Sequence, residues 1–179
     1  MSLWYDCGSG WVQSKAFAKK KLGADVYLCC PGPSLAQVKS EDLDVPGDFK
    51  LAINTAYPHI RPDMWIGMDT PNCYDKNIWW ESFPKICRGT YKEAIIGGQK
   101  IKGCPQQYFA DIVNQANPLT MFHRRNHDAA FVWQSNTFEL AIHVAAWMGA
   151  QNIYLLGCDF GGSKDYHDDR VLRDNHRKR

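Results

Sequence analysis

The sequence contains no uninterrupted apolar run of the roughly 20 residues that a membrane-spanning helix needs. It also has no large excess of charge, because 21 Lys and Arg residues face 19 Asp and Glu residues, for a formal net charge of +2. A chain close to neutral has no overall field that attracts nucleic acid or an anionic membrane. The N-terminal residues have no apolar core segment of the kind found in signal peptides. We therefore expect a cytoplasmic protein with no membrane span and no strong nucleic-acid signal.

The seven cysteines form no Cys-x-x-Cys pair, which excludes a zinc ribbon and a dithiol redox motif. Cys29, Cys30 and Cys158 lie in apolar runs, where a free cysteine packs as a small hydrophobic side chain. Unpaired cysteines of this kind favour a reducing compartment. His123 and His127 have the i, i+4 spacing of a helical metal site, but no glutamate follows His123 as a metalloprotease motif requires. We therefore predict no metal site from these spacings.

Apolar runs of strand length are present along the chain, and the last two are separated by a helical pattern. Runs that are apolar throughout suit strands covered on both faces, as in a parallel sheet. Asn136 and Glu139 form a capping-box pattern at the start of the helix, and Gly149 ends it. The alternation predicts a doubly wound α/β fold with a mainly parallel sheet. The runs cover residues 25–30, 49–57, 63–69 and 152–160.

The length suggests a single α/β domain over residues 1–179. Within it, residues 97–130 contain two prolines and a polar run, which predicts a loop-rich insertion.

Small or polar residues follow each of these strands, and the carboxyl edge of an open parallel sheet is where ligands bind. Gly32, Pro33 and Ser34 follow the first strand, without the lysine of a Walker loop and without a Gly-x-Gly-x-x-Gly fingerprint. Gly32 permits close approach of the backbone to a ligand, and Ser34 is predicted to cap a helix with Gln37 three residues on. A phosphate at that helix N-terminus and a tight turn without a ligand are both consistent with this pattern.

The other strand ends also allow two interpretations each. Asn54 is suited to contact a base or a ribose, or to form a turn with its own backbone. Asp69 is suited to hold a metal or a sugar hydroxyl, or to cap the next turn. Ser135, Asn136 and Thr137 offer a second anion or ribose site, or only the cap of the long helix.

The final strand is followed by residues with candidate catalytic chemistry. Gly157 permits close approach of a ligand, and Asp159 stands at the strand end. A glycine-containing loop then carries Tyr166 and His167, which are suited to gating the site and moving a proton.

These residues resemble the small bacterial sialyltransferases that use CMP-sialic acid. The resemblance rests on Gly-Pro-Ser-Leu after the first strand, an Asn after the second, and a polar helix start followed by Gly-x-Asp-Phe. It covers about residues 25–69 and 135–160. The same skeleton occurs in archaeal 6-hydroxymethylpterin diphosphokinases and in phage-encoded proteins, which this Trp-rich chain resembles most.

The resemblance implies a modified Rossmann-like fold of the GT-A-variant kind, a three-layer sandwich that holds a nucleotide across the strand ends. By position, Gly32, Pro33 and Ser34 would lie beside the nucleotide phosphate or ribose, and Asn54 beside the nucleotide or the sugar. Ser135 matches a serine that contacts the donor.

Asp159 and Asp69 stand at two further positions that have counterparts in these enzymes. Asp159 matches the aspartate of Gly-x-Asp-Phe, while Asp69 replaces an asparagine. The family's general-base histidine and paired tyrosines lie further downstream, on a lid. Tyr166, His167 and His176 are therefore the candidates for those roles.

We accordingly expect a transferase that uses a nucleotide sugar and a glycan or other hydroxyl acceptor and that requires no cofactor. The family's chain continues past this point, so a minimal form of the fold and a homo-oligomer whose partner supplies the lid are both expectations. An ATP- and Mg²⁺-dependent diphosphokinase-like transferase is the first alternative, with Asp69 and Asp159 as metal ligands. A non-catalytic nucleotide- or sugar-binding module of a phage assembly is the second.

Overall fold

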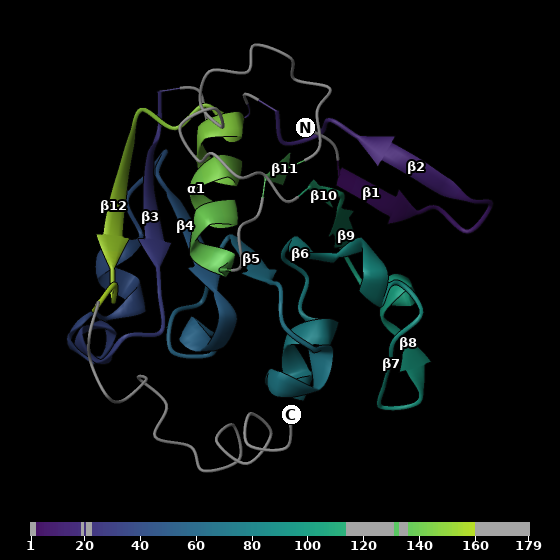
Figure 1. The fold of residues 1–179 in the computed structure, drawn as a ribbon. Coiled ribbons are helices and arrows are strands. Elements are labelled where there is room, and N and C mark those ends of the chain that lie inside the picture. Colours follow the sequence, from purple (N-terminus) through teal and green to yellow (C-terminus); the bar gives the residue numbers. More distant parts are fainter. Residues whose placement is uncertain (1–2, 19, 21–22, 114–130, 133–135, 160–179) are drawn as a thin grey trace.

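The computed structural model describes residues 3–18, 20, 23–113, 131–132 and 136–159. Its centre is an eight-stranded sheet with the strand order β12-β3-β4-β5-β6-β9-β1-β2 (Figure 1). Neighbouring strands from β12 to β9 are parallel, and β1 and β2 add an antiparallel edge. The strands are β1 (Leu3–Asp6), β2 (Trp11–Ser14), β3 (Asp25–Cys29), β4 (Phe49–Ile53), β5 (Met64–Gly67), β6 (Lys85–Arg88), β9 (Gln107–Ala110) and β12 (Asn152–Leu156).

Two strand pairs lie outside this sheet, and short 3₁₀ helices form most of the connections. β7 pairs with β8 antiparallel, and β10 pairs with β11 parallel. These strands are β7 (Ile95–Ile96), β8 (Gln99–Lys100), β10 (Ile112–Val113) and β11 (Phe131–Val132). The 3₁₀ helices are Pro33–Gln37, Ser40–Leu43, Asn54–Ala56, Pro71–Cys73, Lys76–Trp80, Gly89–Tyr91 and Ile101–Gly103.

The central strands β3, β4 and β5 are mostly apolar because alternate side chains enter two cores, one on each face of the sheet. On one face, Val26 and Leu28 of β3 pack in the cluster that includes α1 (Thr137–Met148). On the other face, Cys29 packs in a second cluster, with Trp65 of β5 and with buried residues of the 3₁₀ segments. A mixed α/β fold with a large, mostly parallel sheet is therefore confirmed. Within the described residues α1 is the only α-helix, so the helical layers expected of a three-layer sandwich are not established.

The caps expected for the long helix are present in α1. The side chain of Asn136 accepts a 2.8 Å hydrogen bond from the backbone N–H of Glu139. Gly149 ends the helix at φ 91°, a left-handed conformation that favours glycine. Gly23 N donates to Gly149 O over 3.1 Å, and the C-terminal end of α1 therefore lies at the amino end of β3. It follows that the N-terminus of α1 points toward the carboxyl ends of the parallel strands, as Figure 1 shows.

The segment 97–130 differs from the expected loop-rich insertion where the structure describes it. β9 lies between β6 and β1 in the main sheet, and the buried Phe109 belongs to its core. The sequence pattern of β9 is weak because only Tyr108, Phe109 and Ala110 of this strand are apolar. Residues 114–130 lie outside the described residues.

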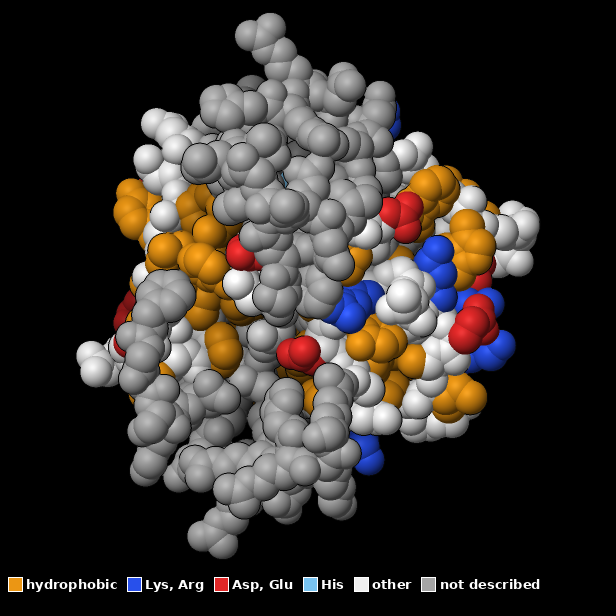
Figure 2. All heavy atoms as spheres, viewed as in Figure 1, with side chains coloured by type: hydrophobic (Ala, Val, Ile, Leu, Met, Phe, Trp, Pro, Cys, Tyr) orange, Lys and Arg blue, Asp and Glu red, His pale blue; other side chains and the backbone are white. Residues whose placement is uncertain are grey.

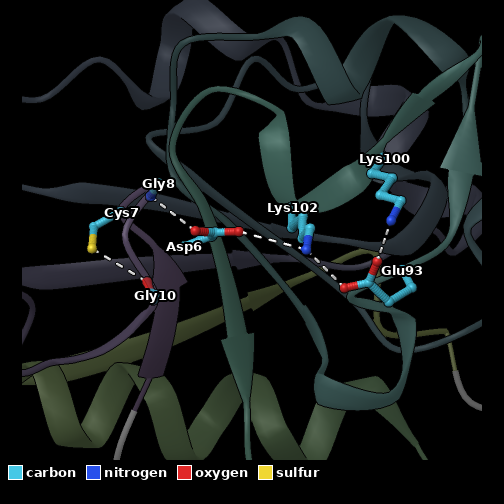
Figure 3. A network of polar contacts seen from close by, with 7 residues as sticks. All are labelled: Asp6, Cys7, Gly8, Gly10, Glu93, Lys100 and Lys102. Atoms are coloured by element: carbon cyan, nitrogen blue, oxygen red, sulfur yellow. Dashed lines mark hydrogen bonds and ion pairs between the residues drawn. The ribbon is translucent and has the colours of Figure 1, made fainter.

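A polar network connects β1, in the antiparallel edge of the sheet, to the segment that contains β7 and β8 (Figure 3). Lys102 Nζ lies 2.9 Å from Glu93 and 3.8 Å from Asp6 of β1, and Lys100 Nζ lies 2.8 Å from Glu93. Hydrogen bonds from Lys100 and Lys102 lower the pKa of Glu93 to about 2. The network therefore links β1 to the β7–β8 pair.

The two edges of the sheet differ in chemistry (Figure 2). Charged side chains of both signs gather over the β1, β7 and β8 side of the view. Apolar side chains gather over the β12 side, where Tyr154 and Leu155 are each 46% exposed. In the part of the chain that the structure describes, no helix is long and apolar enough to cross a lipid bilayer.

Candidate functional site

The strand order reverses between β3 and β12. From β3 the chain adds β4, β5, β6 and β9 to one side, and it later returns to place β12 on the other side. In open parallel sheets, ligands bind outside the carboxyl ends of the strands at such a reversal. The carboxyl ends of β12, β3, β4 and β5 are neighbours at this edge (Figure 1).

The turn after β3 is in direct contact with the residues after β12. Gly32 N donates to Gly157 O over 2.8 Å, and Ser34 N donates to a carboxylate oxygen of Asp159 over 2.8 Å. A Cβ atom on Gly32 would overlap both Gly157 O and the Asp159 carboxylate. A Cβ atom on Gly157, which has φ +66°, would overlap the carbonyl oxygen of Cys30. The two glycines therefore allow the close approach of the strand ends, and only glycine fits at either position.

Ser34 is not the helix cap that the sequence predicts. The helix is a 3₁₀ turn over Pro33–Gln37, with Gly32 at the cap position and no side-chain cap hydrogen bond. The backbone N–H of Ser34 is instead bonded to Asp159, so a carboxylate of the chain itself supplies the negative charge at this turn. The prediction failed because a local pattern cannot register a partner 125 residues away.

Asn54 and Asp69 are joined through Tyr74. The Tyr74 hydroxyl accepts a 2.8 Å hydrogen bond from Asp69 N and donates to Asn54 Oδ1 over 3.4 Å. Burial raises the pKa of Tyr74 well above its ordinary value, so the hydroxyl keeps its proton at neutral pH. The network places an amide and a carboxylate at the adjacent ends of β4 and β5.

The backbone of Asn54 is held in an unusual conformation. Its φ is 49°, in the left-handed region that asparagine adopts more readily than most residues. Trp65 Nε1 donates a 2.8 Å hydrogen bond to Asn54 O. Trp65 also packs edge-to-face on Tyr74 and on Trp79, with ring centroids 4.8 Å and 5.7 Å apart. The packing of these buried rings holds the Trp65 indole in place, and its hydrogen bond to Asn54 O therefore fixes the position of the Asn54 backbone.

Sequence reasoning missed Tyr74 and Trp65. Tyr74 stands five residues after Asp69, in a segment with no periodic pattern. Its proximity to a strand-end aspartate was the only signal available. Trp65 lies inside a run that already predicts a buried strand, so its indole N–H gave no separate indication.

The remaining predicted site residues divide into two groups. Asn136 caps α1 with its side chain, and Thr137 is buried at the first position of the helix. This geometry matches the capping interpretation and leaves a ligand contact as a prediction. The other group lies outside the described residues: Ser135, Tyr166, His167 and His176.

No group of three or more His, Cys, Asp or Glu side chains is arranged to hold a metal ion among the residues that the structure describes. Asp69 and Asp159 are both exposed at the carboxyl edge. The Asp159 carboxylate accepts a hydrogen bond from Ser34 N–H. Asp69 and Asp159 are therefore two separate candidate metal ligands and not part of one cluster of ligands among the described residues.

The chain matches no protein-family model, no curated protein and no solved structure in the three comparisons made.

Proposed function

We propose that this chain is a nucleotide-sugar-dependent glycosyltransferase of the sialyltransferase-like kind, with a modified Rossmann-like, GT-A-variant fold. The observation that carries the proposal is the meeting of the β3 turn and the β12 end at the reversal of strand order, beside the polar ends of β4 and β5. Nucleotides bind at this place in other doubly wound sheets.

The contact between Asp159 and Ser34 supports a hydroxyl group of the ligand, and not a phosphate, at this place. A carboxylate repels a phosphate, because both are anions, and it accepts hydrogen bonds from hydroxyl groups. We therefore assign the ribose or sugar hydroxyls, and not the phosphate, to the neighbourhood of Asp159. The backbone of Gly32 and Pro33 would then lie beside the ribose of the nucleotide.

Asn54 and Asp69 would contact the transferred sugar or the base. The Tyr74 hydroxyl holds the Asn54 side chain and the backbone N–H of Asp69, and Trp65 limits the movement of the Asn54 backbone. A site held in this way binds with less loss of side-chain freedom than a site of free surface residues.

The chemical step would need a base that removes the proton of the acceptor hydroxyl as the bond between the sugar and the nucleotide phosphate breaks. His167 is our candidate, with His176 as the second, and general-base catalysis of this kind contributes about 10²–10⁴-fold. Tyr166 would donate to the departing phosphate. The sugar is transferred to the acceptor oxygen, and the nucleotide leaves with the electron pair of the broken bond.

The test is thermal unfolding of the full chain with CMP, CDP, UDP, GDP, ADP and ATP, each with Mg²⁺ and with EDTA. A ligand at 100 times its Kd stabilises the folded state by about 2.7 kcal/mol, which raises the Tm by several degrees. A rise with CMP or another donor nucleotide that persists in EDTA supports the proposal. A rise confined to ATP or ADP with Mg²⁺ favours the diphosphokinase-like alternative, in which Asp69 and Asp159 would hold the metal.

A matched pair of variants connects any shift to this edge of the sheet. Asp69→Asn removes one exposed carboxylate at the end of β5, and Asp42→Asn removes one from the connection that returns to β4. The proposal requires the shift to fall in the first variant and to persist in the second. No shift with any nucleotide in the parent chain, or an equal shift in both variants, would contradict the proposed site.

Binding alone does not demonstrate transfer. Product formation from the donor that binds, measured with a panel of glycan acceptors, tests the chemical step. His167→Ala and His176→Ala should reduce turnover without reducing the nucleotide shift. Unchanged turnover in both variants would refute the assigned base, and binding without turnover for any donor would favour a non-catalytic binding module.

A further inference from the structure

Two cysteine thiols are in contact where β3 and β12 end. Cys30 directly follows β3, and Cys158 lies two residues after the last residue of β12. The Cys158 thiol donates to the Cys30 sulfur, and the two Sγ atoms are 3.0 Å apart. The contact therefore joins the same two segments that form the reversal of strand order.

The backbone on either side holds these sulfurs together. Cys30 N donates to Leu156 O over 2.8 Å, and Gly32 N donates to Gly157 O over 2.8 Å. The two sulfurs are 3.0 Å apart, and a disulfide bond is about 2.05 Å long. Forming the bond would therefore require the sulfurs to approach each other by only about 1 Å.

The two thiols differ in accessibility. Cys30 is 5% exposed in the core under α1, whereas Cys158 is half-buried at the rim of that core. A reagent in solution therefore meets Cys158 first, and Cys30 lies behind it as the second thiol of the pair.

We propose that Cys30 and Cys158 form a reversible intramolecular disulfide when the chain meets a low-molecular-weight disulfide such as oxidised glutathione. The Cys158 thiolate attacks one sulfur of the reagent, which forms a mixed disulfide and releases one glutathione thiolate. The Cys30 thiolate then attacks the Cys158 sulfur, forms the Cys30–Cys158 bond and releases the second thiolate. Two cysteines lose two electrons, the reagent gains them, and the two cysteine protons end on the two glutathione thiols.

Cys29 offers an internal control for this reaction. It is adjacent to Cys30 in sequence, but it is fully buried on the opposite face of the sheet. The Cys29 thiol donates to Tyr27 O over 3.7 Å and lies on the face of the sheet opposite Cys158, so it is not placed to form the bond. Burial raises the pKa of both Cys30 and Cys158, and we therefore expect oxidation over minutes to hours and not an immediate reaction.

The consequence would be a covalent clamp across the candidate site. The bond would close a loop over a sequence separation of 128 residues and would tie the β3 turn to the β12 end. Unpaired cysteines in a reducing compartment are the usual setting for disulfides that form transiently under oxidation. The proposal does not depend on which ligand the site binds.

The experiment oxidises the reduced full chain with glutathione disulfide at about pH 8 and blocks the remaining thiols with an alkylating reagent. We expect a proteolytic peptide that links Cys30 to Cys158, with a mass about 2 Da below the sum of the two reduced peptides and no alkylation at either cysteine. Reduction with dithiothreitol should restore both thiols. The oxidised chain should melt on the order of 10 °C higher than the reduced chain.

Two variants make the assignment specific. Cys158→Ser, a change at a half-buried position, should abolish the linked peptide, and Cys29→Ala should leave it intact. Peptide mapping of the parent chain answers the same question if the Cys29 variant fails to fold. A mixed glutathione disulfide that persists on Cys158, or an equal protection of Cys30 from alkylation in the parent chain and in Cys158→Ser, would overturn the proposal.

Discussion

The carboxylate of Asp159 accepts a 2.8 Å hydrogen bond from the backbone N–H of Ser34, which lies 125 residues earlier in the chain. This bond ties the end of β12 to the turn after β3. It also satisfies a backbone donor in the first turn of a 3₁₀ helix that has no side-chain cap. Asp159 therefore connects the two strand ends at the reversal of strand order, and its carboxylate adds a negative charge to the candidate site.

Replacing Asp159 with alanine should lower the free energy of unfolding by about 1 kcal/mol, because Ser34 N–H loses its acceptor but remains within reach of water. Asp159→Asn keeps one acceptor oxygen and should lose about half as much. Urea unfolding of both variants measures the difference. Asp42→Ala, at an exposed acidic position, serves as the control and should change the free energy by less than about 0.5 kcal/mol. Equal losses at positions 42 and 159 would contradict a stabilising role for the bond.

Gly32→Ala tests the close approach of the two strand ends. The added Cβ would overlap Gly157 O and the Asp159 carboxylate, and backbone atoms can yield only if the turn shifts. We expect a loss of about 1–3 kcal/mol, the usual range for overpacking. Gly89→Ala is the matched control, since the atom nearest to the added Cβ would be Ala110 O at 3.5 Å, an ordinary contact. Similar unfolding midpoints for the two variants would show that the turn has room.

Tyr74→Phe removes the hydroxyl that joins Asn54 and Asp69. The backbone N–H of Asp69 would lose its partner, and an unsatisfied buried donor costs about 1–3 kcal/mol. Tyr57→Phe also removes one hydroxyl, but that group bonds to the Glu81 carboxylate at 2.9 Å. Water can replace the phenol at this half-buried carboxylate, so the loss should stay below about 1 kcal/mol. A larger effect at Tyr57 than at Tyr74 would refute this ranking.

Lys85 should make the stability of the chain depend on pH in the alkaline range. It is fully buried at the start of β6, where Nζ donates to Glu81 O and Phe83 O. Burial lowers the pKa of Lys85 to about 8, while an unfolded lysine has a pKa of about 10.4. Between these values the unfolded chain binds more protons, and this residue therefore raises the free energy of unfolding as pH increases, by at most about 3 kcal/mol.

Lys85→Met removes that contribution. Other groups also titrate in this range, so the quantity to measure is the difference in free energy of unfolding between the parent and Lys85→Met at about pH 7.5, 9 and 10.5. We expect the difference to change in favour of the parent as pH rises. A difference that stays constant with pH would mean that Lys85 is charged in the folded state throughout the range.

The sequence predicts the parts of this fold that depend on residues close to one another in the chain. Asn136 and Gly149 delimit α1 as expected, because capping and left-handed termination depend on residues within one turn. The apolar runs of β3, β4 and β5 are strands as expected, since both of their faces are buried. For the candidate site, the sequence predicted only that polar residues stand at the carboxyl ends of the strands, and not which of them are in contact.

What could not be predicted depends on partners that are distant in sequence. The role of Ser34 is decided by Asp159, and β9 becomes a central strand only because β1 and β6 pair with it. The network of Asn54, Tyr74 and Asp69 needs two strand ends and a 3₁₀ segment in register. A sequence shows the functional groups of each such residue but not the distant residue with which it forms a hydrogen bond or a strand pair.

The position of β3 beside β12 has a consequence for synthesis of the chain. Asp25 at the start of β3 pairs with Asn152 of β12, a separation of 127 residues. On the ribosome, β3 can pair with β4 early, but its other edge has no native partner until β12 has emerged. Contacts of such long range form late and slowly, and an open strand edge is the usual place for pairing with another nascent chain. The last strand of the sheet to be translated therefore also protects one of the first.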